Sequence, residues 1–556
     1  MPTFSARSMS VASRTPIFWL AMVAGLLAFS VQSGELGSAD TMHRLQTAHS
    51  FWTGQPAVFP NEYPEFGVHG RGGRLYDWYG IGQPLLMLPA DIIGTAIAKL
   101  PIVASYEDTD PTVRNIVVTY ATNILINVLT ALVCYEFLLL LGFDIAQAVA
   151  GVLALLFCTT HLHYTQNMME NNYIMLLTLA GFRYQYEWLR TGKTRAMLIG
   201  SAAFGLNLLT RLTTGLDLVA GGIFLLLVLW FEKAGSGNDR VGRGAHARPV
   251  ERSSTAFSNL RAEFRQRVIS YLKITLPVYA LFLSLDRLYQ FYRFGNWTTT
   301  YVHNFTVERR LQDPSLPANY PWTTPFLKGF LGALISPEKS IFLFDPLIVL
   351  TVVITVLGWK RFSSSVKAYL VATIFLLFAY TCFYARYYEW SGNFAWGDRY
   401  VSSVVEMASF VSVPLLLKFR LQLGRMVWSL GICFIGVSLM IQLASLAFWL
   451  PLEIYQADDF GHPQWVIWLR VKNIVAFALG KIDDWGLNTD SMAYDQWDYR
   501  HITAWNFLPF VLRRIGEVPR WVVDVAFAVW TATIAALIYS LRMLYGRISQ
   551  FREMNH

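Results

Sequence analysis

Pro16-Ile-Phe-Trp-Leu-Ala-Met-Val-Ala-Gly-Leu-Leu-Ala-Phe-Ser-Val-Gln-Ser33 is an apolar run that leads directly into the acidic stretch Gly34-Glu-Leu-Gly-Ser-Ala-Asp-Thr-Met-His43. Aromatic and glycine-rich sequence then continues to about Val113, where a long series of apolar stretches begins. A simple membrane anchor needs no such loop, and a channel rarely opens with one. The order of these segments indicates chemistry on the far side of a membrane, by residues held against the bilayer surface.

Composition places the chain among membrane proteins. It is 54% hydrophobic and only 15% charged, and its mean hydropathy is +0.37, outside the usual range of a soluble globular protein. A helix needs about 20 apolar residues to cross about 30 Å of hydrocarbon. We therefore predict one all-α polytopic integral membrane domain, residues 1–556, with about twelve transmembrane helices, at residues 16–33, 115–140, 145–160, 172–189, 195–211, 215–231, 272–291, 341–359, 368–385, 401–417, 427–449 and 521–541.

Two apolar stretches have a second interpretation. The run 81–100 is interrupted by Pro84, Pro89 and Asp91, so we expect a helix at the membrane interface there and no full crossing. The first span, 16–33, is short and is followed by small residues, which also fits a cleaved signal peptide. Cleavage would leave the loop that follows tethered on one side only.

The distribution of Lys and Arg predicts the orientation, because short basic loops tend to stay in the cytoplasm. The most basic segment is the linker 232–271, and three shorter connections and the tail carry the same bias, at Arg190, Lys193, Arg195, Lys360, Arg361, Lys367, Lys418, Arg420, Arg425, Arg542, Arg547 and Arg552. Both termini are then cytoplasmic, in the inner membrane of a cell envelope. The loops 34–113, 292–340 and 450–520 and the turns 161–171 and 386–399 face outward. No aromatic platform accompanies the basic linker, so nucleic-acid binding is not expected.

Several short motifs follow one another between about residue 35 and residue 400 on the predicted outer face. They are Ser38-Ala-Asp40, Leu75-Tyr-Asp-Trp-Tyr-Gly-Ile-Gly-Gln-Pro-Leu-Leu86, Arg293-Phe-Gly, Gly332-Ala-Leu-Ile-Ser-Pro-Glu-Lys-Ser340, Phe344-Asp-Pro346 and Trp396-Gly-Asp-Arg-Tyr400. In order and placement the set resembles the GT-C superfamily of membrane glycosyltransferases. The resemblance is to its bacterial branch related to protein O-mannosyltransferases and aminoarabinose transferases. The last third of the chain is similar only in general layout.

The resemblance implies transfer of a sugar from a polyprenyl-phosphate donor to a glycan, lipid or protein acceptor on the exoplasmic face, with inversion. The phosphate leaves as a weakly basic anion, so the reaction needs one carboxylate to take the acceptor proton. Cations or hydrogen-bond donors must stabilise the departing phosphate. The alternative is a transporter or flippase for a lipid-linked or small polar substrate. A transporter is expected to show repeated halves and ionisable residues near mid-membrane, and no internal repeat is visible here.

Two acidic residues compete for the role of base. Asp40 matches the position of the family's catalytic acid, and Glu35 lies nearer the membrane. The family often has adjacent acids here, whereas this chain separates them, which leaves the assignment open between the two. Asp40 also precedes an amphipathic stretch, Thr41 to Phe51, so it is expected to cap a helix on the membrane surface.

Further candidates for the site lie at the outer ends of the predicted spans. Glu170, Arg211, Arg386, Asp398 and Arg399 are expected to bind the donor phosphate or another part of the substrate, because ionisable residues beside spans are costly. Structural alternatives are an ion pair of Arg211 with Asp217 and a salt bridge that closes the Arg399 turn.

A divalent metal is a further hypothesis, with His161, His163 and Glu170 as ligands. In the last outer loop, 463–479 is expected to lie on the membrane surface as a helix. With Trp485, Trp497 and Trp505 it would cover the acceptor groove or serve as a plain lid.

Overall fold

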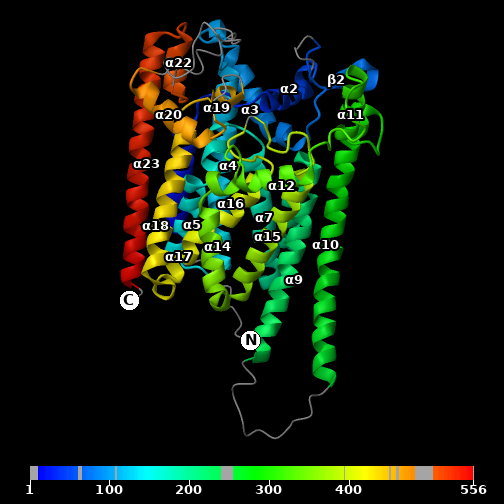
Figure 1. Cartoon of the computed structure of the whole chain (residues 1–556), viewed down its shortest axis with the longest axis vertical. Coiled ribbons are helices and arrows are strands. Elements are labelled where there is room, and N and C mark those ends of the chain that lie inside the picture. Colours follow the sequence, from blue (N-terminus) through cyan, green and yellow to red (C-terminus); the bar gives the residue numbers. More distant parts are fainter. Residues whose placement is uncertain are drawn as a thin grey trace.

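A computed structural model gives the fold of the chain, which is a bundle of long apolar helices (Figure 1). The structure describes residues 11–60, 66–106, 109–238, 254–393, 395–449, 452–458, 463–481 and 505–554. Within these ranges the β-structure is one short antiparallel hairpin of β1 (Val68–His69) and β2 (Leu75–Tyr76). The prediction of an all-α architecture is therefore confirmed.

Every stretch predicted as a span coincides with helix. Among the described residues, six helices are long and apolar enough to cross a membrane; they are α4 (Val113–Leu140), α9 (Gly215–Asn238), α10 (Ser254–Phe294), α15 (Ser364–Tyr384), α18 (Arg420–Ser445) and α23 (Arg520–Met554). The other predicted spans lie on shorter or less apolar helices, which are α1 (Val11–Val31), α5 (Ile145–Cys158), α7 (Asn171–Thr191), α8 (Thr194–Thr210), α13 (Ile341–Phe344), α14 (Leu347–Gly358), α16 (Ser402–Phe410) and α17 (Ser412–Lys418).

Polar residues set where these helices begin, and aromatic residues fill the space between them. Thr112 caps α4, and Asp144 forms a capping box with Gln147 at the start of α5. Inside the bundle the rings of Phe182 and Phe224 stack with centroids 5.4 Å apart. Pairs of neighbours in this core are α1 with α4 and α23, α7 with α8, and α9 with α15.

The shorter elements gather at one end of the bundle (Figure 1). They are α2 (Ala39–Thr53), α3 (Gly82–Ala98), the β-hairpin, α11 (Tyr301–Gln312), α12 (Phe326–Ile335), α19 (Leu452–Asp458), α20 (Val466–Ala478) and α22 (Leu508–Ile515). These elements belong to the loops predicted to face outward. The turn between α17 and α18, which carries the basic residues Lys418 and Arg420, lies at the opposite end (Figure 1).

The helix predicted at 81–100 forms as α3, and Pro89 lies inside it. One of its faces packs on α2 and α4, where buried Asp91 accepts hydrogen bonds from His49, Trp52 and Arg114. Its other face exposes Ile92 and Ile93. The amphipathic pattern is that of a helix at an interface.

Two sequence predictions are corrected by the fold. Asp40 does not cap α2: the cap is Ser38, whose hydroxyl accepts from the Thr41 N–H, and Asp40 lies in the first turn. The linker 232–271 is shorter than predicted, because α9 continues to Asn238 and α10 already begins at Ser254. Residues 239–253 lie outside the described ranges.

Candidate active site

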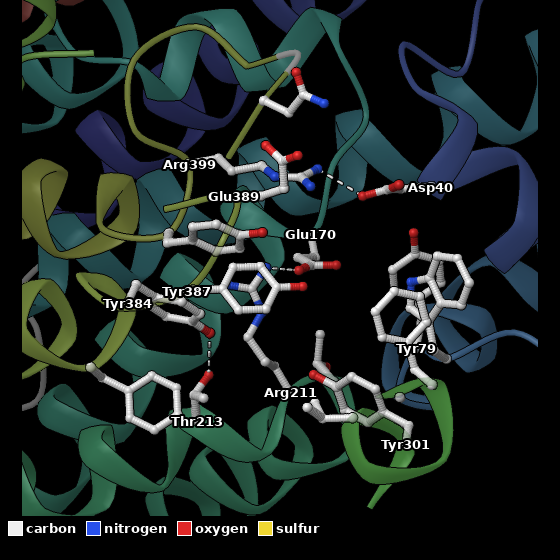
Figure 2. A pocket seen from close by; sticks show the side chains of 18 of the residues that line it. Asp40, Tyr79, Glu170, Arg211, Thr213, Tyr301, Tyr384, Tyr387, Glu389 and Arg399 are labelled. Atoms are coloured by element: carbon white, nitrogen blue, oxygen red, sulfur yellow. Dashed lines mark hydrogen bonds and ion pairs between the residues drawn. The ribbon is translucent and has the colours of Figure 1, made fainter. Parts of the chain in front are cut away.

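A cavity opens at the end of the bundle where the short elements gather. Its volume is about 290 Å³. Asp40, Glu170, Arg211 and Arg399 all line it, and they come from α2, the turn before α7, the end of α8 and the turn before α16. The structure thus brings together residues that are far apart in the sequence (Figure 2).

The start of α2 is held against the turn that carries Glu170. The Thr41 hydroxyl donates to the Met168 carbonyl. Gly37 has a φ of +77°, and a Cβ there would lie 2.9 Å from the Asn167 Cα. A side chain at residue 37 would push α2 away from this turn, so glycine is required for Asp40 to reach the cavity.

Asp40 forms an ion pair with Arg399, whose Nη1 donates to Oδ2 at 2.7 Å. Burial disfavours the ionised carboxylate, but the Arg399 charge and hydrogen bonds from Tyr79 and Arg399 outweigh it, so the pKa of Asp40 lies below its ordinary value. Burial lowers the pKa of the nearby His43 to about 4. At neutral pH Asp40 in the cavity is therefore ionised, and the nearby His43, which lines a separate pocket, is neutral.

Glu170 lies between two arginines, because Arg44 and Arg211 both bind its carboxylate. The Arg44 guanidinium also lies 3.9 Å from the centroid of the Tyr79 ring, and that of Arg211 lies 5.3 Å from the Tyr400 ring. The alternative of an Arg211–Asp217 ion pair is wrong. Asp217 instead accepts from Thr178, Asn207 and Tyr380 within the bundle.

A buried lysine, Lys339, holds the backbone of the turn 386–399 in place. The Lys339 ammonium donates to the carbonyls of Asn393 at 2.5 Å and Ala395 at 2.8 Å. Burial lowers the pKa of Lys339 to about 8. These bonds fix the position of the segment that leads into Arg399.

The other predicted residues of this turn do not line the cavity. Arg386 is exposed, and the Asp398 carboxylate is buried and accepts from the Tyr400 N–H at 3.0 Å. Burial raises the pKa of Asp398 to about 7. The geometry gives Asp398 a structural role in the turn and leaves Arg386 outside the site.

Glu35, the competing base, also lies outside the residues that line the cavity. It is buried, and Arg514 donates to its carboxylate at 2.6 Å. This contact ties the loop after α1 to the last turn of α22. Proximity in sequence to Asp40 therefore does not bring Glu35 into the site.

The three predicted metal ligands are not brought together. Glu170 is engaged by arginines, His161 Nε2 bonds the Asn127 side chain at 2.8 Å, and His163 stacks on Trp396. In the ranges that the structure describes, no group of three His, Cys, Asp or Glu residues has an arrangement that could hold a metal ion.

The last outer loop contains the helix predicted at 463–479, which forms as α20. Trp505 packs on Phe448 and Phe477, so this tryptophan serves the packing of the loop. Trp485 and Trp497 lie outside the described residues.

Sequence analysis missed several side chains of the cavity. Arg44 and Tyr79 contact the candidate carboxylates directly, and Glu389 lies beside Arg399 (Figure 2). A signal for Tyr79 existed in the Tyr-rich motif at 75–86, and Glu389 belongs to the quoted turn. Arg44 is one turn after Asp40 on α2, so the two share a helix face.

The cavity can bind an anion and accept a proton, because arginines and the ionised Asp40 face the same open space. No model of a known protein family matches this chain, and neither does a curated protein or a solved structure.

Proposed function

We propose that this protein is a membrane glycosyltransferase of the GT-C type, which moves a sugar from a polyprenyl-phosphate donor to an acceptor hydroxyl. The observation that carries the proposal is the meeting of Asp40, Glu170, Arg211 and Arg399 in one cavity. A reaction that releases a phosphate anion and takes up one proton needs this combination of arginines and carboxylates.

The arginines are the groups that would bind the donor phosphate. Arg399 and Arg211 both line the cavity, and both guanidinium groups lie near the ring of Tyr400. A guanidinium can donate two parallel hydrogen bonds to two oxygens of one phosphate. Among the described residues, the buried Nε of Arg399 has no hydrogen-bond partner. As the bond to the sugar breaks, charge grows on the phosphate, and these fixed cations stabilise it.

Asp40 is the proposed base. The acceptor oxygen attacks the anomeric carbon, and its proton passes to the Asp40 carboxylate as the new C–O bond forms. The bond from the anomeric carbon to the phosphate oxygen breaks at the same time, and polyprenyl phosphate leaves with the electron pair. One displacement at one carbon inverts its configuration. The low pKa of Asp40 keeps its carboxylate ionised at neutral pH, which is the form that can take the proton.

The proposed topology has twelve crossings, both termini in the cytoplasm and the cavity on the exoplasmic side of the inner membrane. Two of the crossings would be built from consecutive short helices, α13 with α14 and α16 with α17. The basic turn at Lys418 and Arg420, at the end opposite the cavity, supports this orientation.

A transporter is the second candidate, and one observation favours it. His161, Glu406 and Asp345 are buried within the bundle, and His161 Nδ1 lies 3.5 Å from the Glu406 carboxylate. Ionisable groups inside a membrane domain often belong to a transport path. None of these three groups lines the cavity that holds the arginines, and this difference favours the enzyme.

The test is sugar transfer in purified membranes with a panel of radiolabelled polyprenyl-phosphate sugars, comparing wild type with Asp40→Asn. Label that reaches an acceptor only with the wild type supports the enzyme, its donor and its base. Transfer that persists in Asp40→Asn would move the base to Glu389 or Glu170. Folded protein that transfers nothing from any donor would favour the transporter.

A further inference from the structure

One side of the cavity, next to Arg211, has a different chemistry. A groove lined by Thr213, Tyr301, Trp322 and Phe383 continues from it, and these residues line both spaces. Among the described residues that line the groove there is no Asp, Glu, Lys or Arg. The site therefore extends from a charged end into an uncharged end that carries aromatic rings and threonine hydroxyls.

The aromatic rings at this end support one another. Trp322 meets Phe383 edge to face at 5.3 Å and Tyr387 at 5.6 Å. Tyr320 lies 5.1 Å from Tyr388. Rings that pack against each other in this way keep their positions with little loss of entropy when a ligand arrives.

Two polar side chains line the cavity next to these rings: Asn393, and Glu389, which also lies beside Arg399. Within the described part of the chain, the Glu389 carboxyl forms no hydrogen bond or ion pair. Burial raises the pKa of this carboxyl, and its oxygens can accept hydrogen bonds from a ligand. Lys339 holds the backbone of the same turn from below, which fixes both side chains before any ligand binds.

On the basis of the proposed function, we propose that this aromatic end is the acceptor subsite and that the acceptor is a neutral carbohydrate. The apolar C–H face of a pyranose packs on Trp322 or Tyr388, and its hydroxyl groups bond to Glu389 and Asn393. An anionic acceptor would find no cation in the groove. A prenyl chain would leave the Glu389 carboxyl buried without a partner, which is unfavourable.

A peptide acceptor is disfavoured by the walls of the groove. They are α11, the segment 320–322 and the end of α15. An extended peptide is commonly held by the hydrogen-bonding edge of a sheet, and these walls present helices and a turn.

The experiment measures initial rates of the purified full chain with its labelled donor and three acceptor classes: neutral trisaccharides, a Ser/Thr-rich peptide and a phosphorylated glycolipid. Trp322→Ala is expected to raise the KM for the trisaccharide about tenfold, since an aromatic stacking contact is worth about 1.4 kcal/mol. The KM for the donor should stay unchanged. Glu389→Gln should raise the acceptor KM while keeping the side-chain volume.

Trp297→Ala is the matched control, because Trp297 stacks on Phe291 outside the cavity and is 49% exposed. Trp322→Phe, which keeps a ring, should recover most of the acceptor affinity. Binding of the trisaccharide alone, followed by saturation-transfer NMR, gives a second readout that does not depend on turnover.

The outcomes separate the subsite from the enzyme. Transfer to the peptide or glycolipid but not to the trisaccharide overturns the carbohydrate subsite and keeps the transferase. A rise in the donor KM alone in Trp322→Ala assigns the groove to the donor and also overturns it. Trisaccharide binding that needs Trp322, in a protein that cleaves no donor, retains the carbohydrate site and rejects the transferase.

Discussion

Two arginine–carboxylate pairs lie at the same end of the bundle, and they differ in what surrounds them. Arg470 binds Glu453 through Nε and Nη2, both at 2.6 Å, and its Nη1 donates to the carbonyls of Ser445 and Phe448. Both side chains of this pair are fully buried. Arg399 and Asp40 make a single bond at 2.7 Å and face the open cavity.

The contrast teaches that pairing by itself does not mark a functional site. The sealed pair satisfies its own donors and acceptors and joins α19 to α20, so its role is architectural. In the cavity pair, the Arg399 Nε has no hydrogen-bond partner within the described ranges, and the pair lies beside Glu170, which two arginines bind. Open space next to incompletely satisfied charges is the property that permits exchange of a protein partner for a substrate.

The largest expected difference between the two pairs is the loss of activity in Asp40→Asn. Asparagine keeps the shape and the contact to Arg399 but cannot take a proton, so kcat should fall by about 10² to 10⁴. The thermal midpoint in detergent should change little. The measurement is sugar transfer at saturating donor, with Glu35→Gln as the control acid outside the cavity. Loss of activity in Glu35→Gln with full activity in Asp40→Asn would reverse the assignment.

Breaking the sealed pair, Arg470 with Glu453, should lower the stability of the protein. Arg470→Met leaves Glu453 charged and unpaired in the interior, so it should destabilise the protein by about 3–5 kcal/mol. Thermal unfolding in detergent would measure this as a lower midpoint. The double variant Arg470→Met, Glu453→Leu should recover most of the stability, because a well-packed apolar pair can replace a buried ion pair. A double variant as unstable as the single one would mean that the pair does more than hold α19 on α20.

The same double replacement at the cavity distinguishes the two regions. Arg399→Met combined with Asp40→Leu should leave the protein folded but without transfer activity. The double variant of the cavity pair is thus expected to be stable but inactive, unlike the double variant of the Arg470–Glu453 pair. If the double variant transferred sugar, neither residue would belong to the catalytic machinery.

Much of the fold followed from the apolar runs, since every predicted span overlaps one helix or two consecutive helices. Asp40, Glu170, Arg211 and Arg399 were also identifiable from the sequence, because ionisable residues at the ends of apolar spans are costly and few. Their gathering in one cavity was an expectation of the predicted topology. The local sequence was thus sufficient to predict the helices and to identify the charged residues of the site.

Partners were not predictable, because they depend on contacts distant in the chain. Arg211 binds Glu170, which is 41 residues away, and not the neighbouring Asp217. Glu35 pairs with Arg514 at a separation of 479 residues. Glu389 carries no sequence pattern of its own, and only the folded turn places it in the cavity. Sequence spacing gives no information on such contacts once the intervening helices pack.

A smaller effect is expected from weakening the phosphate contact. Arg399→Gln removes the charge that would bind the donor, so the KM for the donor should rise roughly tenfold to a hundredfold. Arg399→Lys keeps the charge but not the paired N–H donors, so its KM for the donor should lie between those of the wild type and Arg399→Gln. Arg386→Gln is the matched control, because Arg386 is an exposed arginine of the same turn. Equal effects of Arg399→Gln and Arg386→Gln would show that Arg399 makes no special contact with the donor.

The smallest expected effect is a shift of the pH profile when one hydrogen bond to Asp40 is removed. The Tyr79 hydroxyl bonds the ionised Asp40 and helps to keep its pKa below 3.8. Because the base must be ionised, activity on the acid side is lost as the pH falls through this pKa. Tyr79→Phe removes a donor to the charged form, which raises the pKa of Asp40, so the acid limb of kcat/KM should move to higher pH by roughly 0.5 to 1 unit.

Phenylalanine keeps the ring that the Arg44 guanidinium covers, so the packing of the cavity wall is preserved in this variant. Tyr387→Phe is the control, because Tyr387 lines the same cavity on the side opposite Tyr79 (Figure 2). A shift of the acid limb in Tyr79→Phe but not in Tyr387→Phe would identify Asp40 as the titrating group. An unchanged limb would instead mean that the group that titrates in the pH profile is not in contact with Tyr79, and Glu389 would then become the stronger candidate for the base.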